Sequence, residues 1–168
     1  NKYEISFEGY YKEMNNLIAY KEGAYTVNAN IDWQEKVEID GLGKSYGIEF
    51  FLQKKTGRAN GWIAYTFSRN TRQFVNINNG KPFNYKYDRM HDISIVFFYK
   101  INNNIDMTAT WVYGTGQPFS MPLSRYDVIN DASRWMQPEN VNFDYNSQVF
   151  IYDGINNYRM RAYHRLDI

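Results

Sequence analysis

The sequence predicts an all-β protein whose antiparallel up-and-down strands, about six in number, form an arc of a large transmembrane β-barrel. Three observations predict this fold class. Apolar and polar side chains alternate over segments of about ten residues. The connections between these segments are alternately short and long. Aromatic residues make up 18% of the chain, as is typical of strands and of membrane interfaces.

The first three predicted strands cover residues 2–14, 45–55 and 62–74. Successive side chains of a strand point to opposite faces, so apolar residues of one parity form a single stripe. In these three segments the stripe contains Tyr3, Ile5 and Phe7, then Ile48, Phe50 and Leu52, then Ile63, Tyr65 and Phe67. The glycine-containing stretch 56–61 joins the second and third segments as a hairpin turn.

The last three predicted strands cover residues 91–101, 105–114 and 159–168. The middle pair has the clearest alternation and is joined by three asparagines at 102–104, which predicts a second hairpin. Its apolar stripe contains Ile93, Ile95, Phe97, Tyr99 and Ile101, then Ile105, Met107, Ala109, Trp111 and Tyr113. In the last segment Leu166 and Ile168 alternate with charged residues.

The connections between these strands run long, short, long, short, long, with the long ones at 15–44, 75–90 and 115–158. This alternation places the short turns on one rim and the long loops on the other. Outer-membrane barrels have this arrangement, with short periplasmic turns and long extracellular loops. The alternative is a soluble antiparallel sandwich, which does not require such sidedness and in which structureless long loops are uncommon.

The longest loop is expected to contain a hairpin of its own. Asp153 and Gly154 follow the β-prone run 149–152, and Asp-Gly readily adopts the positive φ angles of a type I′ turn. We therefore expect a two-residue turn here, above the barrel rim.

Composition excludes several other classes. The 168 residues carry a net charge of +1, from 19 basic and 18 acidic side chains, which argues against a nucleic-acid partner. No apolar run is long enough for a transmembrane helix. The chain has no cysteine, and His91 and His164 have no further ligand at zinc spacing, so neither a metal site nor a cofactor is expected. No catalytic constellation is evident, and we expect no enzyme activity.

Two groups of aromatic and basic residues are candidate site residues. Near the strand ends, where amphipathic rings favour the membrane interface, lie Trp62, Tyr99, Trp111 and Tyr113. In the longest loop, where aromatic and guanidinium groups can contact a ligand, lie Arg125, Tyr126, Arg134 and Trp135.

Several stretches of the chain also resemble a known family. They are SYGIE at 45–49 with QKKTG at 53–57, GWIAYT at 61–66, INNGK at 77–81 with YDR at 87–89, WVYGTG at 111–116, and YRM at 158–160 with AYHRLD at 162–167. In this order they resemble the barrel of TonB-dependent outer-membrane receptors.

The resemblance implies part of an active transporter in the outer membrane of a Gram-negative cell. Such transporters have about twenty-two strands around a plugged lumen. Residues 1–168 would then be one segment of the barrel, incomplete at both ends and without the plug. The implied partners are outer-membrane lipid, the TonB complex through the missing plug, a surface lipoprotein and a small nutrient ligand. That ligand is left open among glycans, peptides and metal chelates. By itself the segment is expected to form a curved open sheet with unpaired edges, or to pair its strands with those of another copy.

Two other functions stay open on the sequence. A soluble extracellular β-rich carbohydrate-binding module would use the same aromatic residues to stack on sugars. A glycosidase fragment would need a carboxylate pair such as Glu35 with Glu38, or Asp127 with Asp131.

Overall fold

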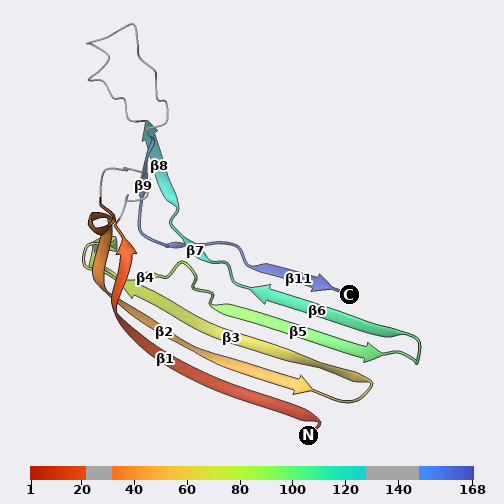
Figure 1. The fold of residues 1–168 in the computed structure, drawn as a ribbon. Coiled ribbons are helices and arrows are strands. Elements are labelled where there is room, and N and C mark those ends of the chain that lie inside the picture. Colours follow the sequence, from red (N-terminus) through yellow and green to blue (C-terminus); the bar gives the residue numbers. More distant parts are fainter. Residues whose placement is uncertain (22–31, 128–147) are drawn as a thin grey trace, which may run out of the picture.

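The computed structural model describes residues 1–21, 32–127 and 148–168, and its main element is an open antiparallel sheet (Figure 1). Six strands lie side by side in chain order: β1 (Tyr3–Tyr20), β2 (Val37–Lys54), β3 (Ala59–Gln73), β5 (His91–Lys100), β6 (Asp106–Gly114) and β11 (Tyr163–Asp167). The all-β class and the meander order are confirmed. Within the described residues the sheet does not close on itself, since β1 and β11 form its two edges.

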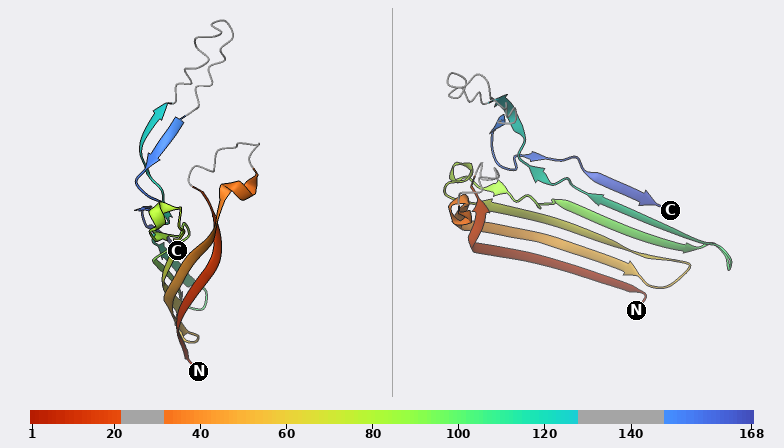
Figure 2. Two further views of the ribbon diagram at one scale, coloured as in Figure 1. Left: turned by 90° about the vertical axis from the view of Figure 1, so that its left-hand side faces the viewer. Right: turned by 45° about the horizontal axis from the view of Figure 1, so that its top comes forward.

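Shorter elements surround one end of this sheet. They are the 3₁₀ helices η1 (Trp33–Lys36) and η2 (Asn78–Gly80) and the strands β4 (Phe83–Asn84), β7 (Pro118–Phe119), β8 (Pro122–Asp127), β9 (Gln148–Tyr152) and β10 (Tyr158–Arg159). Strand β4 pairs with β3, β7 with β10, and β8 with β9. The β8–β9 hairpin projects beyond the end of the sheet (Figures 1 and 2).

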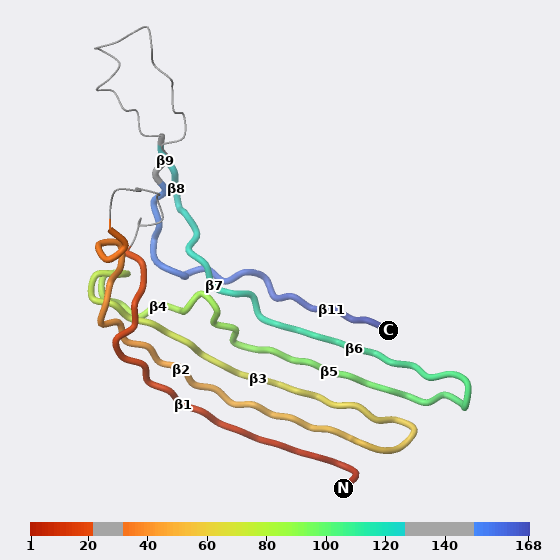
Figure 3. Tube along the Cα trace, viewed as in Figure 1, coloured from red at the N-terminus to blue at the C-terminus, as the bar shows by residue number. Residues whose placement is uncertain are grey.

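The short and long connections lie at opposite ends of the sheet, as the sequence predicts. The tube in Figure 3 shows the β2–β3 and β5–β6 turns at one end. The connections β1–β2, β3–β5 and β6–β11 leave the other end. We call this second end the long-loop rim.

The predicted loop 15–44 is wrong over much of its length. Strands β1 and β2 have 18 residues each and continue beyond the predicted ends. Their register shifts between Met14 and Leu17 and again before Ala19, and Asn16 and Asp40 have positive φ angles of 56° and 60°. These irregularities interrupt the period-two pattern, so the alternation is lost from the sequence while the backbone pairing continues.

The end of the chain also differs from the prediction. The segment 159–168 is not one strand, since Tyr158–Arg159 pairs with β7 and only Tyr163–Asp167 joins the main sheet. The turn predicted at Asp153 and Gly154 is wrong. Neither residue has a positive φ angle. The strand before them, β9, pairs with β8, which comes earlier in the chain, and not with the residues that follow the predicted turn.

Register places one continuous apolar surface on the main sheet. Residues directly opposite on paired strands share a face. The central row crosses all six strands as Ile5, Leu52, Ile63, Ile95, Trp111 and Leu166, and the next row is Phe7, Phe50, Tyr65, Ile93, Tyr113 and His164. We call the side that carries these two rows the apolar face, and the other side the opposite face.

The packed core lies at the long-loop rim. Among the described residues, the buried hydrophobic side chains are Phe74 and Ile77, each 1% exposed. Phe74 stacks on Phe83 with ring centroids 6.3 Å apart. Its ring also lies directly over Gly41 of β2, so a side chain at that position would meet the ring. The rim therefore has a small core of its own, and the sheet below it is a single layer.

We predict that Gly41→Ala destabilises the protein by about 1–3 kcal/mol, because the added methyl group overpacks the buried Phe74 ring. Urea unfolding measures the change in the free energy of unfolding. The matched control is Gly9→Ala, whose new Cβ has only the Gly47 carbonyl oxygen as a neighbour, 4.0 Å away. Equal stability of the two variants would contradict this account of the rim core.

Candidate functional site

The apolar face is the first candidate functional surface. Its side chains are accessible: Ile5 is 68% exposed, Phe7 68% and Leu166 57%. Seen from the side in Figure 2, the described sheet is one thin layer with no second sheet against it. Soluble antiparallel sheets normally cover such a face with a second layer. A contiguous apolar surface of this kind marks contact with lipid or with another protein.

The length of the strands fits contact with lipid. Strands β5 and β6 have 10 and 9 residues. A tilted β-strand needs about 9–11 residues to cross the hydrocarbon core of a bilayer. No helix in the described part of the chain is long and apolar enough to cross a membrane.

The opposite face has mixed character. Its central rows contain Ser6, Phe51, Ala64, Ser94, Val112 and Arg165, and then Glu8, Glu49, Thr66, Asp92, Gly114 and Tyr163. Charged and hydroxyl side chains predominate, although Phe51 contacts Trp62 with ring centroids 6.1 Å apart. The two faces of the sheet are therefore chemically distinct.

A buried ion pair holds the long-loop rim together. The side chain of Asp88 is fully buried, and its Oδ2 lies 2.5 Å from Arg159 Nη2 and 3.8 Å from Arg69 Nη1. The backbone N–H of Asn70 donates to Oδ1 of the same carboxylate at 2.6 Å. Arg159 Nη1 donates further to the carbonyl oxygens of Asp88 and Gly116, at 2.8 and 2.9 Å. We call this set of contacts the Asp88–Arg159 clamp.

The start of β5 is tied to the end of β6 beside the clamp. The His91 N–H donates to Thr115 Oγ1 at 3.1 Å, and the Thr115 N–H donates to the His91 carbonyl oxygen at 2.9 Å. The His91 ring lies 2.9 Å from the Tyr65 hydroxyl through Nδ1. His91 therefore has a structural role, joining three strands at the rim.

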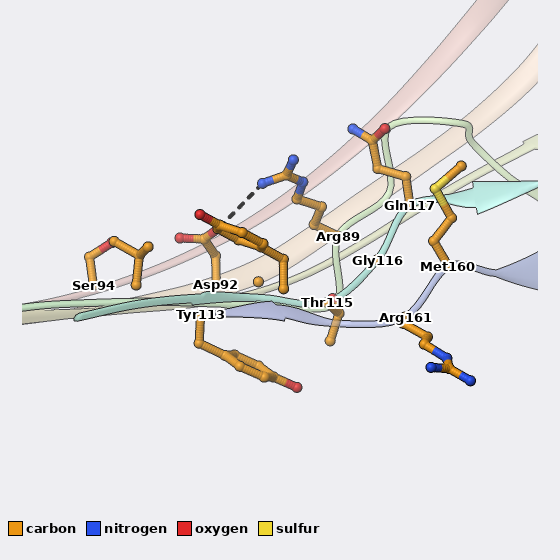
Figure 4. Close-up of a pocket in the computed structure, with 12 residues that line it drawn as sticks. Arg89, Asp92, Ser94, Tyr113, Thr115, Gly116, Gln117, Met160 and Arg161 are labelled. Atoms are coloured by element: carbon orange, nitrogen blue, oxygen red, sulfur yellow. Dashed lines mark ion pairs between the residues drawn. The ribbon is translucent and has the colours of Figure 1, made fainter. Parts of the chain in front are cut away.

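A pocket of about 450 Å³ opens next to the clamp. Figure 4 shows Arg89, Asp92, Ser94, Gln117 and Met160 on one side of the sheet, with Arg161 directed to the other side. Arg89 and Asp92 form an ion pair at 3.7 Å across its wall. The Met160 N–H donates to the Gln117 carbonyl oxygen at 3.0 Å, which joins two further walls. The clamp thus fixes the chain segments that form the pocket.

The structure separates the four predicted interface aromatics between the two faces. Trp111 and Tyr113 lie in the two defining rows of the apolar face, and Tyr99 shares their side through its partner Met107. Trp62 pairs with Val96 on the opposite face. Tyr99 and Trp62 lie at the short-turn end, whereas Tyr113 lies near the long-loop rim.

The predicted ligand-contacting residues lie away from this pocket. Arg125 and Tyr126 are in β8 of the projecting hairpin, where Tyr126 is 52% exposed. Arg134 and Trp135 lie outside the described residues. The pocket is formed instead by the segments 89–94, 112–117 and 160–163, which the tertiary structure brings together beside the Asp88–Arg159 clamp. Arg159 and Asp88 are separated by 71 positions, so no local spacing in the sequence pointed to their pairing.

A metal-binding cluster is absent from the described residues. They contain no group of three or more His, Asp or Glu side chains that could hold a metal ion. The partly exposed Glu38 accepts a hydrogen bond from Asn76 Nδ2 at 2.7 Å, so its carboxylate has a structural partner at the surface. Asp131 lies outside the described residues.

Comparisons with known proteins do not identify a family. No family model, no curated protein and no solved structure matches this chain. The resemblance to TonB-dependent receptors therefore stays a prediction from the sequence, and function has to be argued from the geometry.

We predict that Asp88→Ala lowers the free energy of unfolding by about 3 kcal/mol, because it leaves Arg159 without its buried carboxylate. Urea unfolding provides the measurement. The matched control is Asp167→Ala, which removes an exposed ion pair to Arg165 and should leave the free energy of unfolding nearly unchanged. Similar losses in both variants would show that the clamp does not hold the rim.

Proposed function

We propose that this chain is part of the wall of an outer-membrane active transporter for nutrient uptake. The observation that carries the proposal is the uncovered apolar face of a single-layer sheet with all short turns at one end. In this arrangement the apolar face contacts outer-membrane lipid and the opposite face lines the lumen. The short turns are periplasmic, and the long-loop rim is extracellular.

The magnitude of the hydrophobic effect supports contact with lipid. Removing a large apolar side chain from water contributes about 1.5–3 kcal/mol. If each of the six partly exposed side chains of the central row contributes half of this value, the row contributes about 5–9 kcal/mol. That is comparable to the total stability of a small domain, about 5–15 kcal/mol. An apolar face left in water would therefore favour association or aggregation over a soluble monomer.

The proposed transport needs partners beyond this chain. A plug elsewhere in the same protein would contact the TonB complex, and a surface lipoprotein and a small nutrient ligand would bind from the extracellular side. The chain itself is proposed to have no catalytic role. Release of the ligand would follow from a change in its affinity between two states of the transporter.

Site-directed spin labelling tests whether the apolar face contacts lipid and the opposite face contacts water. The chain has no cysteine, so Ile95→Cys and Ser94→Cys each introduce the only thiol within it, on the apolar and the opposite face respectively. The labels are attached in the full-length protein reconstituted in lipid vesicles. We expect the label at position 95 to collide mainly with oxygen, which concentrates in lipid. The label at position 94 should collide mainly with a water-soluble nickel complex.

The difference in access between the neighbouring positions 94 and 95 decides the outcome of this experiment. Equal access of the nickel complex to both positions would contradict the proposal. A full-length protein that is soluble and monomeric without detergent would also contradict it. That result would favour the soluble carbohydrate-binding module instead.

A further inference from the structure

We propose that two arginines at the rim end of the apolar face, Arg69 and Arg161, bind the phosphate group of an anionic lipid. The inference rests on the proposed function, because it takes the apolar face as the side in contact with lipid. Register places Arg69 of β3 in one row with Tyr46 of β2 and Tyr11 of β1. This row lies beyond the apolar rows, toward the long-loop rim.

Arg161 lies on the same side of the sheet. Figure 4 shows its side chain and the Tyr113 ring on one side, and Tyr113 belongs to the apolar face. Arg161 is exposed, and within the described part of the chain its guanidinium has no hydrogen bond or ion pair. It follows Arg159 by two positions, so the clamp fixes the backbone that carries it.

Charged residues mark the two ends of the apolar face. In β2, Lys44 and Lys54 share its parity, with only apolar and tyrosine side chains between them on this face. Ten residues of a strand span about 33 Å, which at a tilt of about 40° is about 25 Å across the membrane. This is the height of the apolar band of outer-membrane barrels. Lys44 and the adjacent row of Arg69 therefore lie at the level of lipid headgroups.

Positive charge remains at the rim end after the ion pairs are counted. Lys44 is compensated by Glu13, and the buried Asp88 carboxylate is compensated by Arg159. Arg69 Nη1 lies 3.8 Å from the same Asp88 oxygen, which is beyond hydrogen-bond distance. The Arg69 guanidinium therefore keeps its N–H donors for a further acceptor, as does that of Arg161.

A lipid phosphate matches the chemistry of this row. The planar guanidinium of arginine donates two parallel hydrogen bonds to a phosphate. Tyr11 and Tyr46 are 63% and 43% exposed, and such amphipathic rings favour the membrane interface. A soluble anion would have to enter between protein and lipid to reach Arg69. A lipid brings its phosphate to this level while its acyl chains cover the apolar rows.

The other surfaces of the sheet do not have this surplus of positive charge. At the short-turn end of the apolar face, Lys54 is the one charged residue in the six described strands of the main sheet. On the opposite face, Arg89 is paired with Asp92 at 3.7 Å. The proposed attraction is therefore confined to one face and to one leaflet, the one at the long-loop rim.

Native mass spectrometry tests this binding in the full-length protein. The protein in detergent is mixed with equal amounts of phosphatidylglycerol, which is anionic, and phosphatidylcholine, which is zwitterionic. A basic residue near an anionic lipid surface contributes about fivefold in affinity. For two arginines we expect a preference for phosphatidylglycerol of about twentyfold, which weakens in high salt because the attraction is electrostatic.

Substitutions locate the site. Arg69→Gln and Arg161→Gln should each lower the affinity for phosphatidylglycerol about fivefold and leave that for phosphatidylcholine unchanged. Arg161 is exposed and lies outside the clamp, so its substitution is expected to leave the fold intact. Matched controls are Lys54→Gln at the short-turn end and Arg165→Gln on the opposite face of β11, and both should keep the full preference. Thermal unfolding checks that every variant is folded.

Three results would overturn the inference. The first is equal binding of the two lipids by the unmodified protein. The second is a preference that a folded Arg161→Gln protein retains in full, or that Lys54→Gln lowers as much. The third is complete displacement of phosphatidylglycerol by millimolar inorganic phosphate, which would indicate a site for a free anion.

Failure of this inference can be told apart from failure of the proposed function. Spin labels at positions 94 and 95 report contact with lipid of any charge, whereas the lipid mixture reports selection by headgroup. Alternating spin-label access without a lipid preference would leave the proposed function in place and reject the phosphate site. Equal spin-label access would reject the proposed function whatever the lipid preference.

Discussion

The structure depends on a register that places apolar side chains of one parity directly opposite each other across six strands. The row from Ile5 to Leu166 exists only because every pair keeps this register. A slip of one residue on any strand would move its apolar side chains to the opposite face. The chemical difference between the two faces, and with it the proposed contact with lipid, follows from this single constraint.

The long-loop rim adds a second level of order. The Asp88–Arg159 clamp joins the loop before β5, the end of β6 and strand β10, which lie far apart in the sequence. A charged pair at this position can fix geometry because its partners are satisfied on several sides. The clamp holds the segments around the rim pocket, while the Phe74 core supports the neighbouring strands. Sheet and rim therefore supply different parts of the proposed function: the sheet contacts lipid, and the rim presents the ligand site.

The sequence predicts the regular part of this fold well and the rim poorly. Strands β5 and β6 were predicted to within one residue, because their alternation is unbroken and their turn is short. The extensions of β1 and β2 were missed where bulges interrupt the period of two. The turn at Asp153 and Gly154 was wrong because the partner of β9 lies in β8, on the far side of residues 128–147, and local turn chemistry carries no information about it. The clamp and the pocket are also tertiary features.

Tryptophan quenching in the full-length protein tests the central claim most directly, namely that the apolar face contacts lipid. The chain contains 4 tryptophans, and Trp111 lies on the apolar face whereas Trp62 lies on the opposite face. Two variants, each retaining one of these two residues as the only tryptophan, would be reconstituted in vesicles of lipids with brominated acyl chains. The account predicts strong quenching of Trp111 and weak quenching of Trp62. Equal quenching of the two residues, or stronger quenching of Trp62, would contradict it.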